Sequence, residues 1–152
     1  MRTLPLVLLL GCARPPGSPV AAYALRLHPG DDLKDSLVAW SQGVGAATVL
    51  SCVGSLSAAS LRLADQPEPV TLDGPFEIVS LVGTLSPDGA HLHLAVADAE
   101  GHALGGHLTS GSPVYTTAEV VLGVLPALRF SREVDPETTY RELVVEPAGG
   151  RR

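Results

Sequence analysis

The sequence predicts an α+β fold in which one main helix flanks an antiparallel β-sheet. One stretch, residues 32–42, repeats its apolar residues at helical spacing, whereas the rest of the chain consists of apolar or alternating runs of strand length. Short turns rich in Gly, Pro and Asp separate these runs, so neighbouring strands are expected to pair antiparallel. The 152 residues, 45% of them hydrophobic and 17% charged, suffice for a single domain with a buried core.

The first two elements are a strand over residues 23–28 and a helix over residues 32–42. The strand, YALRLH, alternates and is followed by a Pro-Gly turn. Either Asp31 or Asp32 can cap the helix, because a carboxylate there can accept hydrogen bonds from the free N–H groups of the first turn. The apolar stripe of the helix consists of Leu33, Leu37, Trp40 and Val44.

The chain beyond the helix is predicted to form strands. We expect them at residues 46–54, 59–64, 76–86, 91–98, 102–109, 116–125, 127–133 and 141–146. The turn signals between them include Asp73-Gly74-Pro75, Pro87-Asp88-Gly89 and Asp135-Pro136.

The strand at residues 76–86 has apolar side chains on both alternating faces. Strict alternation places Ile78 and Val82 on one face and Val79, Leu81 and Leu85 on the other. A strand covered on both faces needs a second layer, which a neighbouring subunit would supply.

The two ends of the chain are expected to lie outside the folded domain, which we place at residues 21–147. Residues 1–20 have a short apolar run, a Gly-Cys pair and a Pro-rich spacer, which fit an unstructured extension, an export or lipid-attachment signal, or organellar targeting. The run is too short to span a bilayer, and no transmembrane segment is expected. Residues 148–152 are predicted to be a disordered tail. A cytoplasmic protein is our first expectation, with the secreted or lipid-anchored and organellar alternatives open.

Charge and cysteine content argue against direct DNA binding and against a fold held together by disulfides. The formal net charge is −6, and the basic residues form no cluster, so direct DNA binding by this domain is disfavoured. There are two cysteines, too few for a disulfide framework. Cys52 lies in an apolar run and is predicted to be a buried, inert thiol.

Four histidines fall within the segment HLHLAVADAEGHALGGHL, residues 91–108. A three-residue loop, residues 99–101, would place His93 opposite His107, with His91 two residues along the same face. A four-residue loop would turn His107 to the other face. We favour the shorter loop because it puts Gly101 where a left-handed residue is needed. The adjacent Gly105-Gly106 pair would let another backbone or subunit approach closely.

Three converging imidazoles can bind a divalent metal ion. The candidate ligands are His91, His93 and His107, and zinc is the first choice, with nickel, copper or iron as alternatives. The alternative is that these are solvent-facing strand residues. His28 and His102 are expected to be plain surface residues.

Glu119 is the one carboxylate within an otherwise apolar strand. It could act as an outer partner of the metal ligands or as a general base. It could also form an ion pair with Arg26, the lone charge of the first strand, and this is the interpretation we favour.

Several segments taken in order resemble the PPC domain, named for its occurrence in plants and prokaryotes: YALRLHPGDDL, GPFEIVSLVGTLSPDG, HLHLAVADAEGHALGGHL, TTAEVVLG and LRFSRE. The resemblance extends from about Tyr23 to Val145 and implies a homotrimer. The microbial single-domain members resemble metal-binding trimers whose H-x-H and G-G-H motifs fall here on His91, His93 and His107. In plants the domain follows a basic AT-hook. This sequence contains no AT-hook, and Pro75 stands where the plant proteins typically carry Arg.

These observations lead to three hypotheses. The first is a metal-binding homotrimer that acts in protein association or ligand sensing, without enzymatic activity. The second is a metal-dependent enzyme acting on a small molecule, with Glu119 handling protons. The third is a transcription-associated module that a protein partner recruits to DNA.

Overall fold

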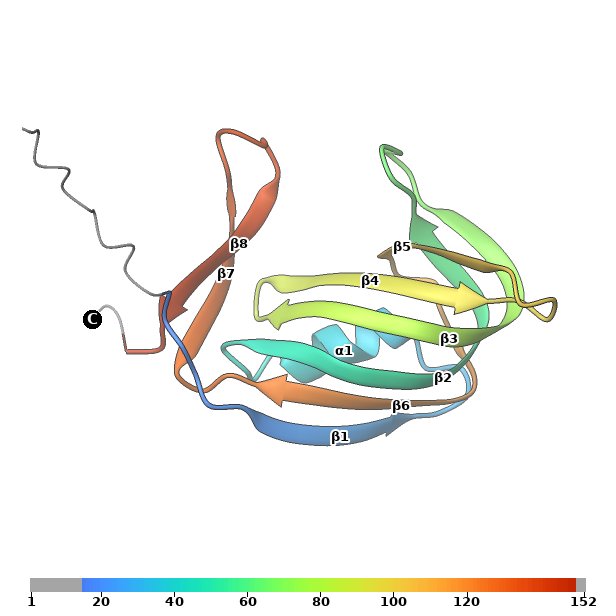
Figure 1. Ribbon diagram of the computed structural model, residues 1–152, viewed down its shortest axis with the longest axis horizontal. Coiled ribbons are helices and arrows are strands. Elements are labelled where there is room, and N and C mark those ends of the chain that lie inside the picture. The colour runs from blue at the N-terminus through green and yellow to red at the C-terminus, as the bar shows by residue number, and fades with distance from the viewer. Residues whose placement is uncertain (1–14, 150–152) are drawn as a thin grey trace, which may run out of the picture.

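Of the eight strands within residues 15–149, six form one antiparallel sheet and the other two form a separate hairpin (Figure 1). The computed structural model describes residues 15–149. Its elements are β1 (Ala21–Leu27), α1 (Leu33–Ser41), β2 (Ala47–Arg62), β3 (Val70–Ser86), β4 (Gly89–Ala97), β5 (Ala103–Leu108), β6 (Val114–Val124), β7 (Leu128–Val134) and β8 (Arg141–Pro147). The main sheet has the order β1-β6-β2-β3-β4-β5, and α1 packs behind it in the view of Figure 1. The predicted combination of an antiparallel sheet with one main helix is confirmed, and the helix is short, with 9 residues.

Helix α1 begins at the predicted cap. The Asp32 carboxylate accepts a hydrogen bond from the backbone N–H of Asp35 (2.9 Å) and two more from the backbone N–H groups of Gly111 (2.7 Å) and Ser112 (2.8 Å). One side chain therefore caps the helix and ties it to the loop before β6. The helix buries its apolar stripe in the core through Leu33 and Leu37.

Strand β2 is longer than expected, and so is its partner β3. The prediction of two separate strands at residues 46–54 and 59–64 is wrong, because β2 runs without a break through most of both. The turn predicted at Asp73-Gly74-Pro75 is also wrong, because these residues lie inside β3. Asp73-Gly74-Pro75 lie opposite a β-bulge of β2 between Leu56 and Ala58. The backbones approach closely there, and a Cβ on Gly74 would lie 2.8 Å from the carbonyl oxygen of Ser57, so the position favours glycine.

Strand β3 does not keep strict alternation along its length. A second bulge, between Ile78 and Ser80, adds one residue to the strand and switches the faces of those that follow. The predicted assignment of these side chains to the two faces of the strand is therefore wrong. Ile78 lies in the core with Leu81 and Leu85, whereas Val79 and Val82 are exposed on the outer face of the sheet.

Strand β5 closes a ring of four strands. It pairs with β4 along one edge and with the end of β2 along the other, where Leu61 lies opposite Leu108 and Arg62 opposite His107. The ring β2-β3-β4-β5 surrounds part of the hydrophobic core, and its closure brings Arg62 beside the histidine hairpin.

The last two predicted strands exist but do not join the main sheet. β7 and β8 pair only with each other among the described residues, and β7 contacts β3. In Figure 1 this hairpin rises at one end of β3 and β4. Residues 1–14 and 150–152, which include most of the expected N-terminal extension and much of the tail, lie outside the described residues. Within residues 15–149, no helix could cross a bilayer.

Candidate metal centre

The β4–β5 hairpin has the register predicted from the shorter loop. His93 lies opposite His107, and the backbone N–H of Asp98 donates to the carbonyl of His102 (3.1 Å). Gly101 has φ +84°, which is the left-handed conformation that the loop requires. The alternative four-residue loop is therefore wrong.

Three histidines meet on the face of this hairpin that points away from the core. We call His91, His93 and His107 the histidine cluster. One ring nitrogen from each lies within 4.8 Å of the others, and Nε2 of His91 is 3.2 Å from Nε2 of His93. The ring centroids are 4.4–5.1 Å apart. The structure thus brings together all three residues that the sequence singled out.

The donor set fits a tetrahedral metal ion. Two nitrogens that each lie about 2.05 Å from one zinc ion, at a tetrahedral angle, are about 3.3 Å apart. The 3.2 Å separation of the His91 and His93 nitrogens matches this spacing, although it also suits a hydrogen bond between two neutral rings. With His107 the cluster could supply three ligands, and this leaves the fourth position for a further group.

Electrostatics around the cluster favour neutral imidazoles. Burial lowers the pKa of His91, as do the positive charge of Arg132 and the neighbouring His93, while Glu142 opposes the shift. Burial likewise lowers the pKa of His107, with the charge of Arg62 as the next cause. A metal ligand must be unprotonated, so these shifts extend the pH range in which the cluster can bind an ion.

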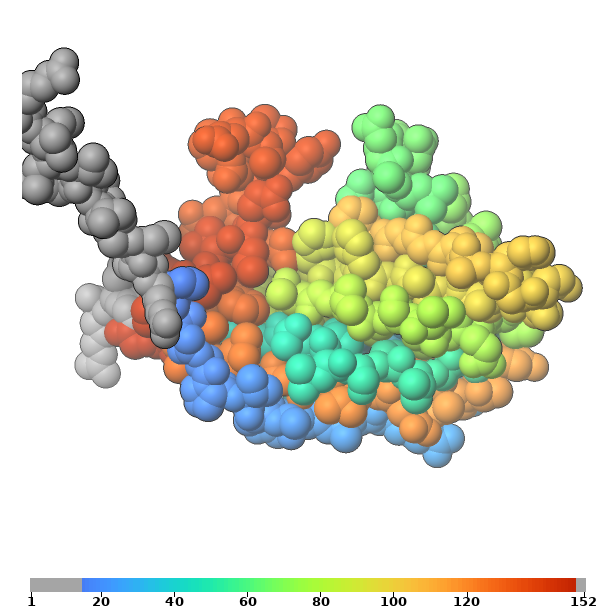
Figure 2. Space-filling model, viewed as in Figure 1, coloured from blue at the N-terminus to red at the C-terminus, as the bar shows by residue number. Residues whose placement is uncertain are grey.

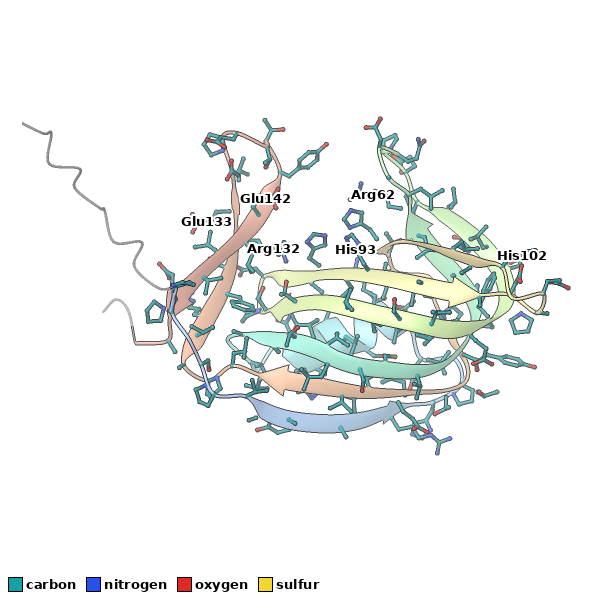
Figure 3. The ribbon with its side chains drawn as sticks, viewed as in Figure 1. Arg62, His93, His102, Arg132, Glu133 and Glu142 are labelled. Atoms are coloured by element: carbon teal, nitrogen blue, oxygen red, sulfur yellow. The ribbon has the colours of Figure 1, made fainter. Side chains whose placement is uncertain are left out.

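The charged neighbours of the cluster come from distant parts of the chain. Arg132 and Glu142 reach toward it from the β7–β8 hairpin, and Arg62 reaches it from the end of β2 (Figure 3). Sequence reasoning missed all three. Arg62 alone had a signal, because it is a lone charge in the apolar run ASLRLA, as Arg26 is in YALRL.

Glu119 is not a neighbour of the histidine cluster. It lies on β6, which β2 and β3 separate from β4, a distance of about 14 Å at the usual strand spacing. The favoured ion pair with Arg26 is wrong as well. The two residues are cross-strand partners, but Nε of Arg26 donates to Oγ1 of Thr117 (3.0 Å), and no ion pair joins Arg26 to Glu119 within residues 15–149. Both side chains are exposed, and such a surface pair contributes little.

The two glycines beside His107 permit close approach of backbone, as expected. A Cβ on Gly105 would lie 2.8 Å from the carbonyl oxygen of Leu94, and one on Gly106 would lie 2.8 Å from that of Arg62. The approaching backbones belong to β4 and β2 of the same chain. Side chains at these two positions would push β5 away from its neighbours.

The remaining candidate residues lie apart from the cluster. His28 is exposed at the end of β1. His102 is exposed at the hairpin turn, where its Nδ1 lies 3.2 Å from Oδ2 of Asp98. Cys52 is buried, and burial raises the pKa of its thiol to about 11, which agrees with the predicted inert role.

A groove opens directly beside the histidine cluster. It is hollowed between the β7–β8 hairpin and the turn that joins β2 to β3 (Figure 2), and the cavity has a volume of about 580 Å³. Histidines 91 and 107 line it together with Arg62, Arg132 and Glu142. The cluster is thus accessible to a molecule larger than water.

Two curated relatives match nearly the whole chain. Bifunctional protein GlmU of Synechococcus sp. (strain JA-2-3B'a(2-13)) is 54% identical over 138 residues, which are 90% of this chain and 22% of that protein. AT-hook motif nuclear-localized protein 2 of Arabidopsis thaliana is 27% identical over 135 residues, 82% of this chain and 40% of that protein. The chain therefore spans about a fifth of the first relative and two fifths of the second.

Solved structures share the same fold. A hypothetical protein from Salmonella cholerae-suis has a TM-score of 0.85 at 44% identity, with 88% of this chain and 98% of that chain covered. A metal-containing protein from Archaeoglobus fulgidus has a TM-score of 0.71 at 29% identity, with 84% and 96% covered. Two proteins whose names suggest DNA binding, from Bacteroides thetaiotaomicron and Ralstonia eutropha, are 20% and 24% identical and share the fold alone.

The family model of the Plants and Prokaryotes Conserved (PCC) domain matches residues 14–126, which reach from the segment before β1 to the end of β6. The match includes the whole histidine hairpin, and it ends before the β7–β8 hairpin that supplies Arg132 and Glu142. The chain belongs to the Plants and Prokaryotes Conserved domain family, the family that its motifs resemble.

Proposed function

We propose that this protein is a homotrimer that binds a divalent metal ion, zinc in the first place, and acts in protein association or ligand sensing. The proposed ligands are His91, His93 and His107, in a domain at residues 21–147. The observation that carries the proposal is the convergence of three imidazole nitrogens within 4.8 Å beside an open groove. The metal-containing relative from Archaeoglobus fulgidus supports it.

An exposed apolar face supports the trimer. Leu50 and Val53 on β2 and Val79 and Val82 on β3 each expose 51–58% of their surface on the side of the sheet opposite α1. The β2–β3 register holds on both sides of this patch, where Thr48 lies opposite Thr84 and Ser55 opposite Glu77. Adjacent exposed valines and leucines of this kind are typical of a subunit interface.

The lengths of the relatives support a role in association. The matched segment is a minor part of both the Synechococcus and the Arabidopsis proteins, so the domain also occurs joined to other sequences. Direct binding to DNA forms no part of the proposal, because the net charge of −6 opposes contact with phosphates.

The metal site is tested by elemental analysis of protein purified without an affinity tag. We expect about one ion per chain in the wild type and none in His93→Ala. His28→Ala is the matched control, because it removes an exposed histidine at the end of β1 that belongs to no group of candidate metal ligands among the described residues. Equal metal content in all three proteins, or no metal in the wild type, would contradict the assignment.

The assembly is tested by light scattering during size exclusion. Three subunits of 15.7 kDa give a mass of about 47 kDa. Val53→Glu would bury a charge in the proposed interface and should give monomers, whereas Val134→Glu, at an exposed position of β7, should leave the trimer intact. If the wild type were a monomer, the proposed trimer would be wrong, and the proposed metal site would be unaffected.

A metal-dependent enzyme acting on a small molecule is the second candidate function, and the groove favours it. An open fourth position on the ion could polarise a carbonyl group or activate water. Glu119 is too far away to move protons in such a reaction. Substitution with cobalt(II) discriminates the two candidates, because a spectrum that changes when small ligands are added shows an open position, whereas an unresponsive spectrum indicates a closed shell.

A further inference from the structure

We propose that the groove beside the histidine cluster binds the carboxylate or phosphate group of a small molecule between the guanidinium groups of Arg62 and Arg132. This inference rests on the proposed function, because the metal ion would supply a third positive group at the same place. The ligand class is therefore a small oxyanion.

The guanidinium of Arg132 is held in a defined orientation. Its NH2 group donates to Oγ1 of Thr84 (2.8 Å), and its NH1 group lies 3.4 Å from Nδ1 of His91. The two contacts hold the guanidinium against β3 and β4 at a place where Arg132 lines the groove. A preorganised donor of this kind costs little entropy when a ligand binds.

The direct contact between His91 and Arg132 indicates where a ligand oxygen would be bound. Its Nε2 faces His93, so a metal ion held by Nε2 leaves the proton on Nδ1. Nδ1 and NH1 of Arg132 are then two donors facing each other at 3.4 Å. A ligand oxygen that lies beside this pair, off the line joining the two nitrogens, can accept from both once each N–H turns toward it. Ligating histidines commonly donate their second N–H to an oxygen in this way.

The positive charges of the groove are not neutralised by the protein. In the part of the chain that the structure describes, no carboxylate lies within ion-pair distance of Arg62 or Arg132. Toward the other described residues, the Arg62 side chain donates a single long hydrogen bond, to the carbonyl of Gln66 (3.5 Å). Glu142 is the acidic residue whose charge acts on Arg132, where it opposes the lowering of the pKa by burial. Its carboxylate accepts a hydrogen bond from the Thr138 hydroxyl (3.0 Å).

The lining of the groove contrasts with the acidic character of the whole chain. Basic side chains outnumber acidic ones there: Lys34, Arg62, Arg132 and Arg141 against Asp88 and Glu142. Low-dielectric walls concentrate such a local field and raise the concentration of anions at the site. The volume of about 580 Å³ is within the range of small-molecule sites, so the occupant is a small molecule rather than a nucleic acid.

The test is calorimetric titration of zinc-loaded protein with inorganic phosphate and, in a second arm, with malonate. We expect one or both to bind the wild type, and the preferred arm identifies phosphate or carboxylate as the group recognised. Arg62→Gln and Arg132→Gln should each weaken binding by about tenfold or more, since each removes a charge-assisted donor. Arg129→Gln is the matched control, because residue 129 lies on the opposite face of the same strand as Arg132 and does not line the groove.

Zinc content and thermal unfolding are measured on every variant before titration. If the wild type binds no zinc, the proposed function fails and this inference falls with it. If zinc binds but neither anion does, or if anion binding is equally tight in the two groove variants and in Arg129→Gln, the oxyanion site is refuted while the metal site stands. The two groove variants are independent, so a folding defect in one leaves the other to decide.

Discussion

Substituting Gly106 with alanine should weaken metal binding without touching any candidate ligand. A Cβ at this position would lie 2.8 Å from the carbonyl oxygen of Arg62, whereas an ordinary contact begins at 3.4 Å. The backbones of β5 and β2 must therefore separate by about 0.6 Å at the point where Arg62 pairs with His107. Zinc–ligand distances vary by only about 0.2 Å, so His107 would leave its ligating position.

The magnitude follows from the size of this displacement. Overpacking of this kind costs about 1–3 kcal/mol, which corresponds to a melting temperature lower by about 3–10 °C. When the residues that orient a metal ligand are disturbed, metal affinity falls by about 10- to 100-fold. Competition between the protein and a chromophoric chelator measures the zinc affinity, and calorimetry of metal-free protein measures the loss of stability.

Gly43→Ala is the matched control for this experiment. A Cβ on Gly43 would meet no atom within 4 Å, and the residue has no left-handed φ, so its zinc affinity and melting temperature should stay close to those of the wild type. If Gly106→Ala bound zinc as tightly as Gly43→Ala, the backbone approach of β2 to β5 would not position His107, and the reasoning would be wrong.

Three further predictions concern the cap, the thiol and the histidines. Asp32→Ala should lower the free energy of unfolding, measured with urea, by about 2–4 kcal/mol, because three N–H groups lose their acceptor. Asp31→Ala should lower it less, because the Asp31 carboxylate accepts from one N–H. In a Cys12→Ser variant at pH 8, the thiol of Cys52 should react with an alkylating reagent about a hundredfold more slowly than after denaturation, because its pKa is about 11 rather than 9.0. Metal-free protein should lose stability as the pH falls below 6.5, because the lowered pKa values of the histidine cluster mean that the unfolded chain takes up protons before the folded one. Melting temperatures between pH 7.5 and 5 check this sign, and a rise in stability on acidification would contradict it.

The register of the histidine hairpin could be predicted because it depends on neighbours in the sequence. A three-residue loop with Gly101 in the left-handed conformation leaves one pairing, in which His93 faces His107. The cap of α1 and its buried stripe were predictable for the same reason, since both follow from the order of residues within one or two turns. The faces of β3 were not, because a bulge changes the alternation without a sequence signal as clear as a loop glycine.

The composition, the strand pattern and the local turn of the hairpin were therefore sufficient to predict the fold class and the three candidate ligands. The surroundings of those ligands depend on contacts between residues far apart in the chain. Arg62 reaches the cluster because β5 closes onto the end of β2, and Arg132 and Glu142 reach it because the β7–β8 hairpin stands against β3 instead of extending the sheet. Local periodicity carries no information about how a separate hairpin packs, and so the groove and its positive charge emerge only when the elements are assembled.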